Sequence, residues 1–178
     1  MIATLYNQWM CTRRFSDVIR VLEAMLATSE SLPKQMVADI WVRLGFGKIC
    51  AGDADGSRRD LIRGRDELAE LRDRSDNRAA FLDQLIQVNG LLRDRQQVEA
   101  NIAAIPEELI MDAFYGPEIE VWVACAWAQL GERDKAIEML RRLLSKPAGP
   151  TRGNLRAHPF WEPLRSDPRF QELVGAKP

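Results

Sequence analysis

The stretch Val121–Leu144 constrains the fold of this chain more than any other part of the sequence. It is typical of two amphipathic helices joined by a tight turn at Gly131. When the rest of the chain is placed in register with Gly131, three further turn positions appear, at Arg13, Gly52 and Arg93. Successive turns lie 39, 41 and 38 residues apart, so the sequence predicts four consecutive helix pairs.

The spacing within the last pair resembles a tetratricopeptide (TPR) repeat, in which an aromatic residue precedes the turn and a small residue follows it. The second unit opens with the W-x-x-L-G pattern of the same family. The matching residues are Trp127, Gly131, Ala136 and Leu140 in the last unit, and Trp41, Leu44, Gly45 and Gly52 in the second. The resemblance implies an all-α fold, a right-handed α-solenoid of about four TPR-like helix pairs with a short C-terminal capping segment.

Breaks in the apolar pattern place the boundaries of the repeats. Pro106 cuts short the second helix of the third unit, and a short helix is expected over Glu107–Tyr115 before Gly116–Pro117. In the second unit Gly45 would let two helices approach closely, and Asp53 or Asp55 would cap the next helix. We expect a single domain over 1–178, with units of about 1–33, 34–75, 76–117 and 118–147 and a cap over 154–175.

The two ends of the chain carry apolar side chains with different expected roles. The tail Leu155–Val174 resembles the closing segment of bacterial TPR regions, and Asp167–Pro168 is a good helix start. At the other end the first helix is short, and its apolar residues would face a repeat that is absent. The side chains expected to cover the last helix are Trp161, Leu164, Phe170 and Leu173; those expected at an exposed N-terminal edge are Leu5, Tyr6 and Trp9. That edge implies a homo-oligomer or a fragment of a longer chain.

Composition argues against several classes of partner and compartment. The formal net charge is −1, so no global field attracts nucleic acid or a membrane surface. The sequence has no run long enough to cross a membrane and no signal peptide. Three cysteines within apolar helical stretches suggest reduced thiols and a cytoplasmic protein.

Catalytic and metal-binding motifs are missing from the sequence. His158 is the sole histidine, and no cysteine lies near it in the chain. Zinc needs about four ligands at compact spacings, which three scattered cysteines and one histidine do not supply. The sequence therefore predicts no catalytic residue, no metal, no cofactor and no enzymatic activity. A buried contact between a cysteine and His158 would reopen the question.

In a TPR stack the first helix of each unit lines a concave groove, and the resemblance places particular side chains there. Phe46 and Trp122 are the candidate anchors, because aromatic residues are enriched in binding hot spots. Packing between helices is the alternative role for both. The full predicted groove comprises Asp39, Arg43, Phe46, Asp83, Gln84, Gln87, Trp122 and Gln129.

The resemblance implies a non-catalytic scaffold that binds a protein or peptide in this groove, with no nucleic-acid or membrane partner. The alternative is a TPR-like regulatory or sensor domain of a larger signalling or transcription-regulatory protein. A closed, apolar pocket in place of an open groove would favour the alternative.

Overall fold

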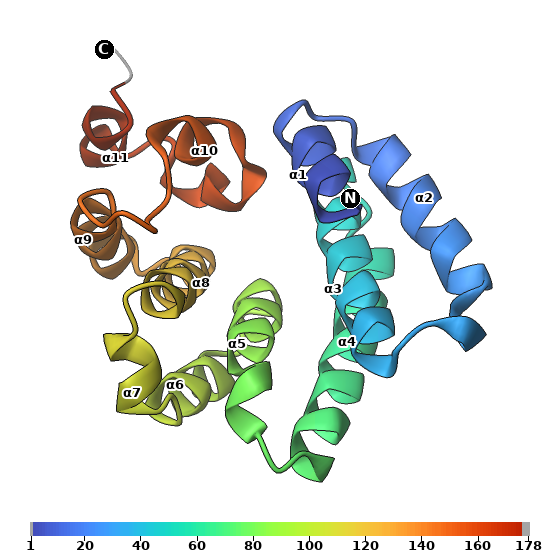
Figure 1. Ribbon diagram of the computed structural model, residues 1–178. Helices are drawn as coiled ribbons and strands as arrows, with labels where there is room; N and C mark the ends of the chain where they lie inside the picture. Colours follow the sequence, from blue (N-terminus) through green and yellow to red (C-terminus); the bar gives the residue numbers. More distant parts are fainter. Residues whose placement is uncertain (1, 176–178) are drawn as a thin grey trace.

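The computed structural model describes residues 2–175, and within that range it contains helices and no β-strand, which confirms the all-α class (Figure 1). The α-helices are α1 (Ile2–Cys11), α2 (Phe15–Ala27), α3 (Lys34–Ala51), α4 (Ala54–Arg74), α5 (Leu82–Leu91), α6 (Arg95–Ala103), α7 (Glu107–Met111), α8 (Tyr115–Gln129), α9 (Arg133–Leu143), α10 (Arg152–Ala157) and α11 (Pro168–Leu173). Three 3₁₀ helices join them, η1 (Ser29–Ser31), η2 (Arg78–Phe81) and η3 (Pro159–Leu164).

Four helix-to-helix turns share one backbone geometry. Arg13, Gly52, Arg93 and Gly131 have φ angles of 60°, 86°, 59° and 81°, so all four lie in the left-handed region. The residue after each of them donates its backbone N–H to the carbonyl five residues earlier, at 2.8–2.9 Å. This bond is the longer one of a Schellman motif, which satisfies carbonyls that the helix end leaves free. The turn positions aligned from the sequence therefore have equivalent conformations.

Side chains that accept backbone N–H groups mark the start of several helices. The Asp53 carboxylate accepts the Gly56 N–H at 2.9 Å, so Asp53 rather than Asp55 caps α4. Before α8, Asp112 accepts the N–H of Tyr115 at 2.7 Å. The helix expected over Glu107–Tyr115 is wrong at its end. α7 stops at Met111, and Tyr115 already belongs to α8. Pro117 fits in the first turn of α8, because a backbone N–H there would have no partner within the helix.

Successive helices pack on one another and follow an arc that brings η3 against the N-terminal helices. α3, α5 and α8 lie on the inner side of the arc, with α2 and α9 on the outer side (Figure 1). At one inner contact, a Cβ added at Gly45 would lie 2.6 Å from Leu61 Cγ, so α3 and α4 approach as closely as expected. η3 packs on α8, and Arg13 pairs with Glu162 at 3.0 Å across the remaining gap.

The N-terminal helix is not the exposed apolar edge expected from the sequence. Leu5 is 41% exposed, but Tyr6 is 4% exposed and Trp9 is half-buried. The Arg43 guanidinium lies 4.8 Å from the centre of the Tyr6 ring. α1 fails the expectation because its residues pack on α2 and α3 of the same chain rather than on a preceding repeat.

The C-terminal segment packs as a cap, as expected, and also reaches further. Trp161, Leu164 and Phe170 are at most 2% exposed, and α11 packs on α9. Asp167 caps α11 by accepting the Arg169 N–H at 2.9 Å, and Arg169 pairs with Asp134 of α9 at 2.7 Å. The segment therefore covers the last helix pair, while η3 also enters the inner side of the arc.

The turn geometry makes opposite predictions for two positions. Arg93 is exposed and has a positive φ, so Arg93→Gly removes steric strain and should raise the free energy of unfolding by about 0.5–1 kcal/mol. Gly131→Ala introduces the same strain, with no side-chain clash to add to it, and should lower that free energy by about 1 kcal/mol. Urea unfolding followed by circular dichroism measures both, and a destabilised Arg93→Gly variant would contradict the common turn geometry.

Candidate functional site

The inner side of the arc carries an aromatic cluster built from three separate parts of the chain. α3 supplies Phe46, α8 supplies Trp122, and η3 inserts Phe160 between them. The Phe160 ring stacks on Phe46 with centroids 4.0 Å apart and planes 15° apart. Trp122 meets the same ring edge-on, with centroids 5.6 Å apart at 90°. The two residues expected to anchor a partner therefore hold the chain's own C-terminal segment.

Polar contacts fix the backbone of this segment beside the aromatic cluster. Gln129 Nε2 donates to the Phe160 carbonyl at 2.9 Å. Glu162 accepts from Arg13 at 3.0 Å and from Arg165 at 2.7 Å. Burying a phenylalanine ring contributes about 1.5–3 kcal/mol and each aromatic pair about 0.5–1.5 more, whereas an exposed ion pair contributes at most about 1. The ring of Phe160 therefore holds the segment more strongly than the ion pairs do, together with the more fully buried Trp161 and Leu164.

His158 extends the stack, and its environment keeps the imidazole neutral. Its ring lies 4.6 Å from Phe160, and Nδ1 accepts the Phe160 N–H at 3.3 Å. Burial lowers the pKa of His158 to about 4, and the positive charges of Arg13, Arg165 and Arg43 add to that shift. The histidine thus serves as a packed aromatic ring in this segment.

Cys125 lines the same cavity as His158 but is not set up as an activated nucleophile. Burial raises the pKa of the Cys125 thiol, while the pKa of His158 is lowered. A thiolate–imidazolium pair needs both shifts in the opposite direction. Cys125 and His158 line the same cavity, but the directions of their pKa shifts therefore do not favour a reactive thiolate.

The other predicted groove residues occupy the same inner side with their own contacts. Asp39 and Arg43 form an ion pair at 2.6 Å, one turn apart on α3. Burial raises the pKa of Asp83, and the carboxylates of Glu118 and Asp39 raise it further. Gln84 accepts a long hydrogen bond from Gln35 at 3.5 Å, and Gln87 is half-buried on α5. Phe46 is 2% exposed, so Phe160 covers its ring.

Two residues of the cluster, His158 and Phe160, were not among the predicted groove residues. The sequence places both in the tail, which was expected to cover α9. Proline and aromatic residues in the run His158–Leu164 are the local signal that this part differs from an ordinary helix. Its position on the inner side depends on the arc returning to its start, which no local pattern encodes.

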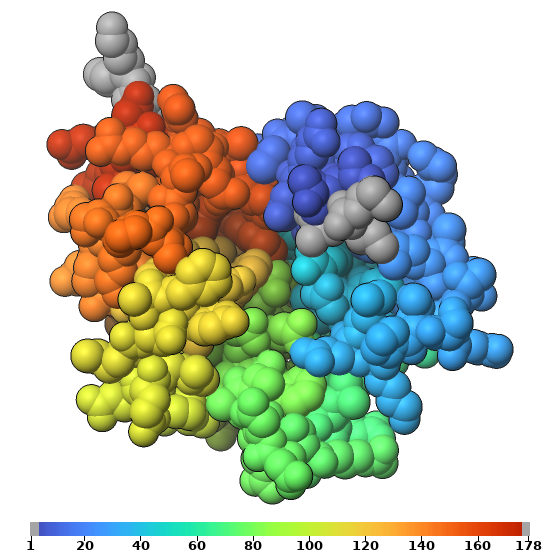
Figure 2. All heavy atoms as spheres, viewed as in Figure 1, coloured from blue at the N-terminus to red at the C-terminus, as the bar shows by residue number. Residues whose placement is uncertain are grey.

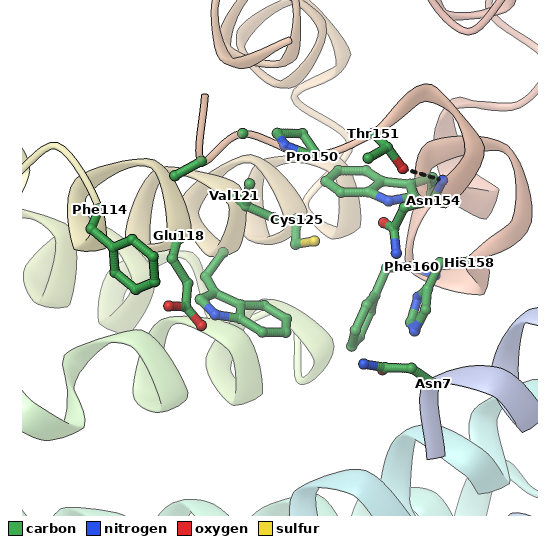
Figure 3. Close-up of a pocket in the computed structure, with 14 residues that line it drawn as sticks. Asn7, Phe114, Glu118, Val121, Cys125, Pro150, Thr151, Asn154, His158 and Phe160 are labelled. Atoms are coloured by element: carbon green, nitrogen blue, oxygen red, sulfur yellow. Dashed lines mark hydrogen bonds between the residues drawn. The ribbon is translucent and has the colours of Figure 1, made fainter. Parts of the chain in front are cut away.

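Beside the cluster a cavity of about 510 Å³ remains open between α1, α8 and the C-terminal segment (Figure 3). Figure 2 shows the molecule hollowed at the centre of the corresponding face. Phe114, Glu118 and Cys125 line it from α8 and its start, Asn7 from α1, and Asn154 from α10. A cavity of this volume is in the range of small-molecule sites.

No family model, curated protein or solved structure matches this chain. Among residues 2–175, no helix combines the length and apolarity needed to cross a membrane. The same part of the chain holds no cluster of three or more histidine, cysteine, aspartate or glutamate residues suited to a metal ion.

Burial of His158 predicts a pH dependence of stability. The pKa of His158 is about 4 when folded and about 6.5 when unfolded, so the unfolded chain takes up a proton first as the pH falls. The free energy of unfolding should therefore drop by about 3 kcal/mol between pH 6.5 and 4 from this group. His158→Phe keeps a ring in the stack and removes the proton site.

Denaturant unfolding of both proteins from pH 7 to pH 4 measures the difference. Because the chain has one histidine, the gap between the two curves reports His158 alone. If the free energies of unfolding of the two proteins differed by a constant amount over this pH range, His158 would take up a proton as readily in the folded chain as in the unfolded one, and the prediction would be wrong.

Proposed function

We propose that this chain is a non-catalytic binding module whose inner groove holds an extended, aromatic peptide segment, and that its own C-terminal segment occupies this groove in cis. The observation that supports this proposal most directly is the position of Phe160. Its ring lies between Phe46 and Trp122, and Gln129 donates a hydrogen bond to its backbone carbonyl. Side-chain pockets and main-chain hydrogen bonds are the two elements by which grooves recognise peptides.

The repeat architecture supports the same proposal. Four turns of one geometry join consecutive helices, and the spacing of the motif residues resembles TPR proteins, whose superhelices bind peptides on the concave side. We therefore interpret the arc as a TPR-like solenoid that the C-terminal segment closes. The free thiols Cys11, Cys50 and Cys125 fit a cytoplasmic location.

The preferred external ligand would share the chemistry of the cis segment. It would present an aromatic ring for Phe46 and Trp122 and a backbone carbonyl for Gln129. It would also carry an acidic residue two positions after the ring, since Glu162 stands in that place and pairs with Arg13. Such a ligand would have to displace the C-terminal segment, so binding would be coupled to its release.

A second candidate function, a regulatory domain that responds to a small molecule, is favoured by the cavity beside the cluster. Its walls come from α8 and from the C-terminal segment together. A ligand there would contact both the groove and the element that closes it, so it would bias the segment toward its docked position.

The peptide proposal predicts that removing the internal ligand exposes the groove. A fluorescent peptide with the sequence of residues 156–166 should bind the full-length Phe160→Ala variant and should bind the unchanged protein much more weakly. The reason is that the cis segment competes at a high effective concentration in the unchanged protein. Fluorescence anisotropy measures both affinities, with circular dichroism to establish that the variant is folded.

Phe170→Ala is the matched control, because Phe170 is a buried phenylalanine of the same tail that belongs to α11, which packs on α9. It should lower stability without creating peptide affinity. Adding Phe46→Ala to Phe160→Ala should remove the affinity again. A folded Phe160→Ala variant that does not bind the peptide would contradict the proposal.

A further inference from the structure

One stripe of α8 lines the cavity and has an uncommon composition for a solvent-facing helix surface. Phe114, Glu118, Trp122 and Cys125 follow at intervals of four, four and three, so they lie on one face. Phe114 is 68% exposed, although it belongs to the cavity wall. In Figure 3 its ring and the Glu118 carboxylate lie beside each other at one end of the cavity.

The charge of the cavity wall is negative and uncompensated. Glu118 is the one side chain of the wall that is charged at neutral pH, since His158 has a pKa of about 4. Within residues 2–175, Glu118 forms no ion pair with a lysine or arginine. The pKa of Asp83 is raised mainly by burial and further by the Glu118 carboxylate, which places the two acidic groups near one another.

The opposite end of the cavity is aromatic and neutral. Phe160 and His158 supply rings there, and the side chains of Asn7 and Asn154 supply uncharged amides (Figure 3). An apolar ligand body would bury its surface among these rings. A cationic group at the other end would meet a carboxylate and the face of an exposed aromatic ring, which are the two features that recognise ammonium groups.

We propose that the cavity binds a small organic cation with an apolar or aromatic body, its ammonium group at Glu118 and Phe114 and its body against Trp122 and Phe160. This inference rests on the second candidate function above. Glu118 is exposed and its carboxylate is solvated; that charge would repel an anion and attract a cation, and an uncharged ligand would gain neither interaction.

Isothermal titration calorimetry of the full-length protein tests this with three probes that share a phenyl body. 2-Phenylethylamine is positively charged at pH 7, 2-phenylethanol is neutral, and 3-phenylpropionate is negative. The amine should bind with one-to-one stoichiometry, the alcohol about tenfold more weakly, and the carboxylate undetectably. Loss of one ion pair and one cation–π contact corresponds to about this factor.

Three variants separate the cation site from general apolar binding. Glu118→Gln should weaken the amine about threefold and leave the alcohol unchanged, which reduces the preference between them. Phe114→Leu keeps apolar bulk and removes the ring face, so it should reduce the same preference. Glu172→Gln, at an exposed glutamate of α11 outside the cavity, should change nothing.

Each of three results would overturn the proposal. The first is that the amine shows no saturable binding up to its solubility limit. The second is that amine and alcohol bind equally, and the third is that Glu118→Gln leaves the amine affinity unchanged. Failure of this proposal is distinguishable from failure of the small-molecule function on which it rests, because saturable binding of the alcohol without any preference for the amine would overturn the cation site and leave that function standing.

Discussion

The stacking of Phe160 on Phe46 is the interaction on which the closed form of this molecule depends. It joins η3, near the end of the chain, to α3, whose residues are more than a hundred positions earlier. Without it the inner side of the arc would expose Phe46 and Trp122 to water, and the cavity would lose the wall that His158 and Phe160 provide. The aromatic contacts outweigh the surrounding ion pairs, since Arg13 and Glu162 are both about half exposed.

The arc that makes this contact possible is set by local backbone chemistry repeated four times. A left-handed residue ends the first helix of each pair, and a five-residue hydrogen bond ties the next residue back to that helix. Glycine occupies two of these positions and arginine the other two, so the geometry is more uniform than the sequence. Close approach at Gly45 then lets α3 and α4 pack with little space between them.

The two candidate functions share one structural element. The C-terminal segment fills the peptide seat and also forms part of the cavity wall, so occupancy of the cavity and release of the segment are linked. A ligand in the cavity would hold the segment in place, whereas a competing peptide would displace it and open the cavity. The coupling follows from the shared residues His158 and Phe160 and needs no movement elsewhere in the fold.

Sequence reasoning located the helices, the four turn positions, the Asp167 cap and the packing of Trp161, Leu164 and Phe170, because each depends on residues close together in the chain or on a single apolar face. It also placed Phe46 and Trp122 on the inner side through the repeat register. It did not place Tyr6 against Arg43 or Phe160 between Phe46 and Trp122. Those contacts join segments far apart in the chain, so they arise only when the packing of all the intervening helices is in place. The sequence by itself therefore determined the helices and the turns between them, whereas the tertiary structure decided what covers their apolar faces.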